Sequence, residues 1–103
     1  MNDEVAWMDA TAQAELVRRG EVTPSELLEA ALARIDKLNP ELNAVIHRLD
    51  EKAEAAVAAG LPEGPFKGVP FLVKDGVCHT AGDPFHCGMQ VLKDAKWIEE
   101  DEL

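Results

Sequence analysis

Lys74 is the residue of this sequence whose setting best suits acid–base chemistry. It follows the apolar run Val69–Val73 and precedes Asp75. An apolar run of this length, entered through a glycine and a proline, predicts a short buried strand. A lysine held against apolar walls has its charged form disfavoured, so its pKa falls, and a neutral lysine can act as a general base near pH 7. The structural alternative is a strand-end lysine with a packed stem and a solvated ammonium.

A second group of reactive residues lies in the loop that follows. Two adjacent pairs of metal-ligand types, Cys78-His79 and His86-Cys87, occur there. Structural zinc sites usually separate paired ligands by about two to four residues, so these pairs are poorly spaced for one tetrahedral ion. We therefore expect no metal and no cofactor, and a metal-binding loop protein is kept as the weakest functional alternative.

Nucleophilic catalysis finds little support in the residues. The chain has a single serine, Ser25, in the expected first turn of a helix, where a hydroxyl suits hydrogen bonding to the helix start. There is no Gly-Ser nucleophile turn and no Gly-rich oxyanion loop. A cysteine nucleophile paired as Cys78–His79 is disfavoured, because neighbours on an extended segment point apart.

The elements expected to position these residues are helices and strands in one chain. The sequence predicts helices over about 10–19, 24–38 and 51–59. The second helix has the best-specified start, because Thr23 and Glu26 form a capping box. Asparagine and proline at 39–40 are expected to end it.

Two short strands complete the prediction. They are expected over about 43–48 and 69–74, with a Gly/Pro-rich loop before the second one. Helices alternating with apolar strands indicate an α/β fold class, in which these strands belong to a larger mixed sheet.

Composition limits the partners. The chain has 103 residues, of which 20 are acidic and 10 basic, for a formal net charge of −10. Nucleic acids and anionic membranes are recognised by basic surfaces, so the acidic excess argues against both. Hydrophobic residues make up 47% of the chain but aromatic residues only 5%, which predicts a thin core.

The termini and cysteines suggest a location. The acidic start, Asp3-Glu4, has no apolar stretch after it, which predicts that there is no secretory signal. No run approaches the length needed to span a bilayer. Two cysteines without a secretory route are expected to be reduced thiols, so the protein is expected to be cytoplasmic.

Several stretches together resemble the amidase signature enzymes. Those in the expected helical part are Asp9-Ala10-Thr11, Leu16–Leu27, Ile35-Asp36 and Asn39–Ala44. The most specific stretch is Gly68–Asp75, Gly-Val-Pro-Phe-Leu-Val-Lys-Asp, which is similar to that family's Gly-x-Pro-x-x-x-Lys-Asp strand. The resemblance covers essentially the whole chain.

This resemblance implies hydrolysis of amide carbon–nitrogen bonds by a Ser–cis-Ser–Lys triad, with a small-molecule amide as the substrate of a full-length relative. Lys74 would stand at the catalytic lysine, which shuttles a proton between itself and the nucleophile through the cis serine. Asp75 would help to fix the end of the strand. Both triad serines lie beyond the equivalent of Leu103 in the family, and Cys87-Gly88-Met89 stands where members often have a Gly-Ser turn.

We therefore expect residues 1–103 to be a single segment, the N-terminal part of an amidase domain with its mixed sheet incomplete and inactive alone. The alternative is a small non-catalytic interaction module that reuses this segment. Self-association of the incomplete segment is expected, because an uncovered apolar strand edge pairs with other chains.

Overall fold

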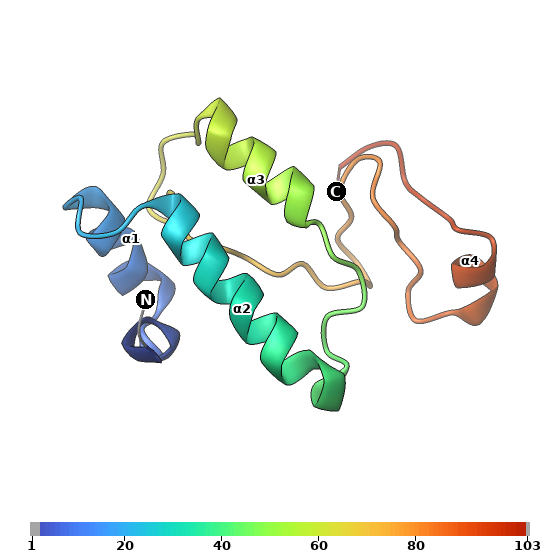
Figure 1. The fold of residues 1–103 in the computed structure, drawn as a ribbon. Coiled ribbons are helices and arrows are strands. Elements are labelled where there is room, and N and C mark those ends of the chain that lie inside the picture. The colour runs from blue at the N-terminus through green and yellow to red at the C-terminus, as the bar shows by residue number, and fades with distance from the viewer. Residues whose placement is uncertain (1–2, 103) are drawn as a thin grey trace. The chain divides into compact units, whose positions relative to one another are not determined.

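The computed structural model describes residues 3–102 and divides into two compact units, Met1–Pro70 and Phe71–Leu103, which we call the N-terminal unit and the C-terminal unit. Helices build the N-terminal unit: the 3-10 helix η1 (Asp3–Trp7), α1 (Ala10–Arg18), α2 (Pro24–Leu42) and α3 (Asp50–Ala59) (Figure 1). The C-terminal unit contains one short helix, α4 (Gln90–Asp94). None of the described helices is long and apolar enough to cross a membrane.

Helix α1 is bounded by its own side chains and by a glycine. The carboxylate of Asp9 accepts a backbone N–H of the first turn at 2.8 Å. At the other end Gly20 takes a φ of +74°. Its N–H donates to the Val17 carbonyl at 3.0 Å, and the N–H of Glu21 donates to the Leu16 carbonyl at 3.0 Å. This pair of bonds is a Schellman motif, and it satisfies the last carbonyls of the helix.

Helix α2 begins as the sequence predicts. The Thr23 hydroxyl accepts the Glu26 N–H at 3.1 Å, and the Glu26 carboxylate accepts the Thr23 N–H at 3.1 Å. This reciprocal capping box satisfies two of the helix's three unpaired N-terminal donors, since Pro24 has no N–H.

The end of α2 lies at Leu42 rather than at the expected residue 38, and Pro40 is inside the last turn. A proline there removes one hydrogen bond of a turn that is ending. The Asn39 side chain ends the helix by binding the backbone that follows it. Its oxygen accepts the N–H groups of Ala44 and Val45 at 2.8 and 2.9 Å, and its amide donates to the Val45 carbonyl at 2.9 Å. The sequence pattern locates this asparagine but not the extra turn that its side chain closes.

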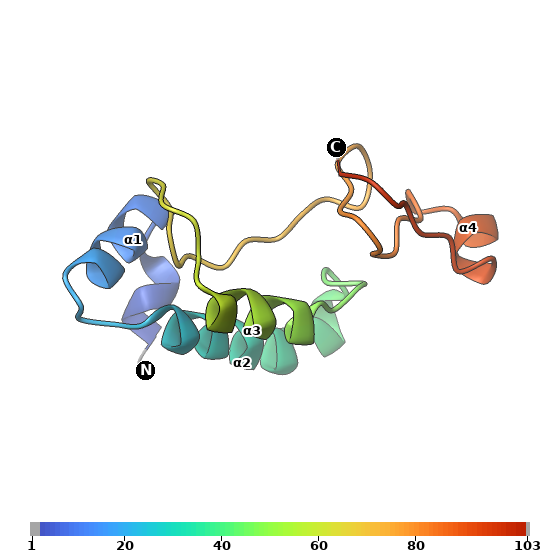
Figure 2. The same ribbon diagram turned by 90° about the horizontal axis from the view of Figure 1, so that it is seen from above.

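Helix α3 lies alongside α2 and runs in the opposite direction (Figures 1 and 2). It begins at Asp50 rather than at residue 51. The N-cap residue is Leu49, which makes no side-chain cap bond. The Arg48 guanidinium donates to the two carboxylate oxygens of Asp50 at 3.1 and 2.8 Å. Arg48 also pairs with Asp36 of α2, so one side chain links the two helices.

The core of the N-terminal unit is small, as the composition predicts. Its buried apolar side chains are those of Val5, Ala14 and Leu27. Gly68 closes this unit, because a Cβ at that position would lie 3.0 Å from Pro24 Cγ and 3.2 Å from Val17 Cγ1. The start of the Gly68–Asp75 stretch therefore packs directly on α1 and on the first turn of α2.

The two expected strands are not formed in the described part of the chain. Neither 43–48 nor 69–74 is a strand, and the pairing seen among residues 3–102 outside helices is one isolated antiparallel bridge, Pro84–Ile98. The expectation of an α/β sheet is thus not met here, and the described chain is helical. The physical reason is that apolar patterning gives a segment its tendency to extend, whereas a strand also needs a hydrogen-bonded neighbour.

Candidate functional site

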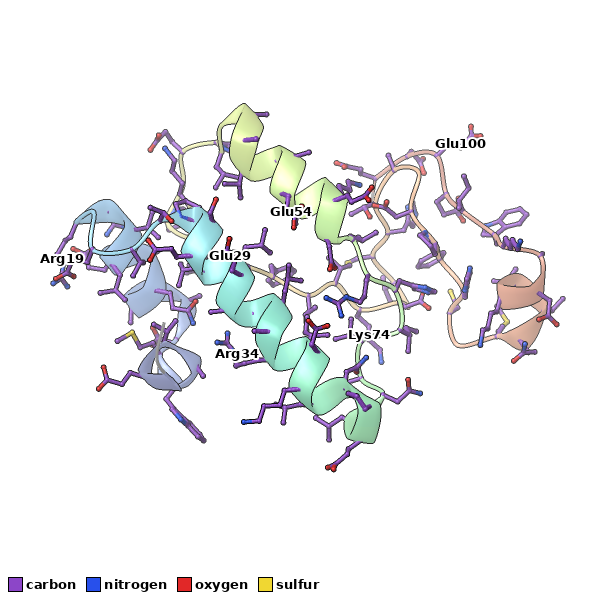
Figure 3. The ribbon with its side chains drawn as sticks, viewed as in Figure 1. Arg19, Glu29, Arg34, Glu54, Lys74 and Glu100 are labelled. Atoms are coloured by element: carbon purple, nitrogen blue, oxygen red, sulfur yellow. The ribbon has the colours of Figure 1, made fainter. Side chains whose placement is uncertain are left out.

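Lys74 lies in the C-terminal unit, at the end of an extended and exposed apolar segment (Figure 3). Phe71 is 86% exposed, Leu72 66% and Val73 48%, and Lys74 is exposed as well. The apolar walls expected around the lysine are therefore not supplied by this part of the chain.

The backbone turns sharply immediately after the lysine. The Gly76 N–H donates to the Lys74 carbonyl at 2.9 Å, which closes a tight turn around Asp75. A Cβ on Gly76 would lie 3.4 Å from Lys74 Cγ and 3.9 Å from Lys74 Cε. The stem of the lysine therefore lies over Gly76. A side chain at position 76 would be in ordinary van der Waals contact with it.

Asp75 ties this turn to a second one farther along the chain. Its Oδ1 accepts the backbone N–H of His86 at 2.8 Å and that of Cys87 at 3.2 Å. The Cys87 thiol donates in turn to the Gly76 carbonyl at 3.4 Å. Three bonds thus join residues 75–76 to residues 86–87, and we call this arrangement the Asp75 clamp.

The rest of the loop is held by its own contacts. The His79 Nδ1 lies 2.9 Å from the Asp101 carbonyl oxygen, and the His79 ring packs edge-on against Phe85 with centroids 5.0 Å apart. Backbone bonds also run from Gly82 to the Glu99 carbonyl at 2.7 Å and from Phe85 to the Trp97 carbonyl at 3.2 Å. These contacts give the loop a defined conformation. Long loops with a defined conformation in compact proteins often carry functional residues.

The structure does not assemble the Cys-His and His-Cys pairs into a metal centre. Both cysteines, Cys78 and Cys87, are free and exposed. Within residues 3–102 there is no group of three or more His, Cys, Asp or Glu side chains that could hold a metal ion. The metal-binding alternative thus gains no support from the described part.

Ser25, the single serine, lies in the N-terminal unit in a setting that does not activate a nucleophile. It follows Pro24 in the first turn of α2 and lines a groove of about 160 Å³ between α2 and α3. Figure 3 labels two carboxylates of this groove, Glu29 and Glu54. The remaining lining residues are Leu28, Val57 and Ala58, so no lining side chain is a histidine or lysine that could take the serine proton.

The shifted ionisable groups are exposed ion pairs of the N-terminal unit. The hydrogen bond from Arg18, followed by its charge and that of Arg19, lowers the pKa of Glu15. The bond from Lys67 lowers the pKa of Glu63. These pairs lie on the surface, where solvent screens the charges and an ion pair adds little to the stability of the fold. They belong to a helix end and a turn, and they do not indicate a reactive site.

Sequence reasoning singled out Lys74 and Asp75 as candidates but did not predict the partners of Asp75. These partners are backbone groups eleven and twelve residues farther along the chain. A backbone N–H has no sequence signature. Only the small number of residues between the Lys-Asp pair and a glycine-containing turn, Cys87-Gly88, could have suggested a contact.

Known proteins give an independent view of this chain. The family model described as Amidase matches residues 26–101. The 6-aminohexanoate-cyclic-dimer hydrolases of Pseudomonas sp. (strain NK87) and Paenarthrobacter ureafaciens are each 54% identical over 89 residues, which is 86% of this chain and 18% of each of those proteins.

A solved structure agrees with these matches. The structure of 6-aminohexanoate cyclic dimer hydrolase complexed with substrate superposes with a TM-score of 0.86 at 44% identity, over 93% of this chain and 20% of that one. The chain thus spans about a fifth of the length of the relatives that it matches. The Gly68–Asp75 motif lies inside the region matched by the family model, and the chain belongs to the amidase signature family.

Proposed function

We propose that this chain carries the catalytic lysine of an amidase, and that Lys74 is that lysine. Its place in the Gly-x-Pro-x-x-x-Lys-Asp motif supports the assignment, together with membership of the family. In a complete site of this type the lysine takes a proton from the cis serine, which in turn activates the serine nucleophile. The overall reaction is hydrolysis of an amide carbon–nitrogen bond.

The mixed sheet of the fold class belongs to the same proposal. Residues 69–73 are apolar and lie outside any helix, and Phe71, Leu72 and Val73 expose side chains that a covered strand would bury. In a domain of the relatives' length, a neighbouring strand would pair with this segment and exclude water from the lysine. An amine in such dry surroundings is the more effective base.

The names of the relatives suggest which amide to test first. The matched hydrolases act, by name, on the cyclic dimer of 6-aminohexanoate, and one solved relative holds its substrate. We propose a small aliphatic amide as the substrate class, with this cyclic diamide as the first compound. Nucleic acids and membranes are not proposed as partners, and the free thiols Cys78 and Cys87 suit a reducing cytoplasmic compartment.

The decisive experiment transplants this chain into a relative. The matching segment of a 6-aminohexanoate-cyclic-dimer hydrolase is replaced by residues 3–102, giving a graft whose serines come from the host. Lys74→Met should abolish turnover of the cyclic dimer, whereas Lys93→Met, an exposed lysine of α4, should leave it unchanged. A graft that is active with Lys74→Met would refute the assignment.

The isolated chain provides the complementary test. We expect no hydrolysis of small aryl or aliphatic amides above background, because the described residues offer no activated nucleophile. Turnover that disappears in Ser25→Ala or Cys78→Ala would mean that the chain has a catalytic site of its own.

Self-association is also part of this proposal. Phe71, Leu72 and Val73 expose apolar side chains on an extended segment outside any sheet, which is a pairing site for other chains. Sedimentation and thermal melting over a concentration series should show association that weakens in Leu72→Lys. A monomer with a sharp, concentration-independent melt would instead favour the interaction module as a finished domain.

A further inference from the structure

Hydrogen bonds of the tight turn and of the Asp75 clamp hold the backbone on both sides of Asp75. The Lys74 carbonyl is held by the Gly76 N–H at 2.9 Å, and the Gly76 carbonyl is held by the Cys87 thiol at 3.4 Å. Between them the Asp75 carboxylate accepts two N–H groups from the turn at 86–87. The Asp75 carboxylate makes two of the three bonds that join residues 75–76 to residues 86–87, so Asp75 is the main contact in this arrangement.

The clamp reaches the lysine side chain through Gly76. The Lys74 stem lies over the face of Gly76, with Cγ and Cε 3.4 and 3.9 Å from the position that a Cβ would take. The amine extends from Cε, so the contact of the stem with Gly76 links the position of the amine to the 74–76 turn. Asp75 sets that turn, because its carboxylate ties it to backbone N–H groups eleven and twelve residues farther along the chain.

We propose that Asp75 is a positioning residue for the reaction, which acts by locking the 74–76 turn and thereby aiming the Lys74 amine; this rests on the proposed role of Lys74. Catalysis needs the proton-transferring groups within hydrogen-bond reach, and a misplacement of about 1 Å can cost about a hundredfold in rate. Cys87 supports the lock through its thiol, and Gly76 supports it through the N–H that closes the turn on the Lys74 carbonyl.

The first test uses the 103-residue chain in solution. In NMR spectra, Lys74 Hγ and Hε should show contacts to the Gly76 Hα protons, and the amides of Gly76, His86 and Cys87 should exchange slowly. Asp75→Ala should remove the contacts and speed exchange at all three amides by about tenfold or more. Asp94→Ala is the matched control, because Asp94 is a carboxylate of the same unit bonded to the Gln90 side chain.

The second test measures kinetics in the graft described above. Asp75→Ala should lower kcat by about a hundredfold with KM within about twofold, since a misaimed base slows chemistry without removing a binding contact. Asp75→Asn keeps an acceptor oxygen and should restore part of kcat. The Asp94→Ala graft should match the unmodified one.

The outcomes separate the two claims. Lost NMR contacts with a lowered kcat support the positioning role. Contacts that persist in Asp75→Ala, or a kcat that is unchanged when they are lost, overturn it. An active Lys74→Met graft would overturn the proposed function instead, and the NMR contacts would then decide by themselves whether Asp75 orients Lys74.

Discussion

Gly68→Ala should be one of the more destabilising single-methyl changes in this chain, for two separable reasons. Gly68 has a φ of +89°, which L-residues rarely adopt. The added Cβ would lie 3.0 Å from Pro24 Cγ and 3.2 and 3.3 Å from the two Val17 methyl carbons. Backbone strain of this kind costs about 1–2 kcal/mol, and overpacking costs about 1–3 kcal/mol.

The unfolded state offsets a part of this cost. Alanine has fewer unfolded conformations than glycine, which stabilises the folded protein by about 0.4–1 kcal/mol. The net loss in the free energy of unfolding should be about 2–4 kcal/mol. With a urea m-value of about 1–3 kcal/mol/M, the denaturation midpoint should fall by roughly 1 M or more.

Two other glycines of the N-terminal unit separate strain from crowding. Gly20 has a φ of +74° and nothing within 4 Å of the position that a Cβ would take, so Gly20→Ala should show the strain alone, about 1 kcal/mol. Gly64 has neither feature, so Gly64→Ala should be neutral or slightly stabilising. If the urea denaturation midpoint of Gly68→Ala equals that of Gly64→Ala, the reasoning is refuted. If it equals that of Gly20→Ala, crowding by Pro24 and Val17 adds nothing to the cost.

The other predictions concern caps and charges of the same unit. Thr23→Ala should lower the free energy of unfolding by about 1 kcal/mol in a urea melt, because it removes the capping box, while Thr23→Ser should keep most of it. Asn39→Ala should cost about 1–3 kcal/mol, because three hydrogen bonds to residues 44–45 are lost; an unchanged melt would mean that these bonds do not hold the end of α2. In a carboxyl NMR titration Glu15 should have a pKa below 4.5, and raising the salt to about 1 M should bring it closer to that value. Because this pKa is lowered by folding, its small contribution to stability is present above the unfolded pKa and is lost as the pH falls through the folded one; Arg18→Gln should remove the shift.

The local features of this chain were determined by its sequence. Thr23, Pro24 and Glu26 fix the start of α2, because a capping box uses side chains three residues apart and needs no distant partner. Gly20 ends α1 for the same local reason. The family could also be predicted, because the Gly68–Asp75 motif keeps its residue types whatever surrounds it.

Features that depend on distant partners were decided by the tertiary structure. The apolar pattern over 69–74 predicted a strand, but strand formation requires a second chain segment to accept and donate its hydrogen bonds, and the described residues supply none. The predicted burial of Lys74 is absent from the described chain for the same reason. The Asp75 clamp could not be predicted, because its partners are backbone N–H groups, which every residue but proline carries, and only folding brings those of His86 and Cys87 to the carboxylate.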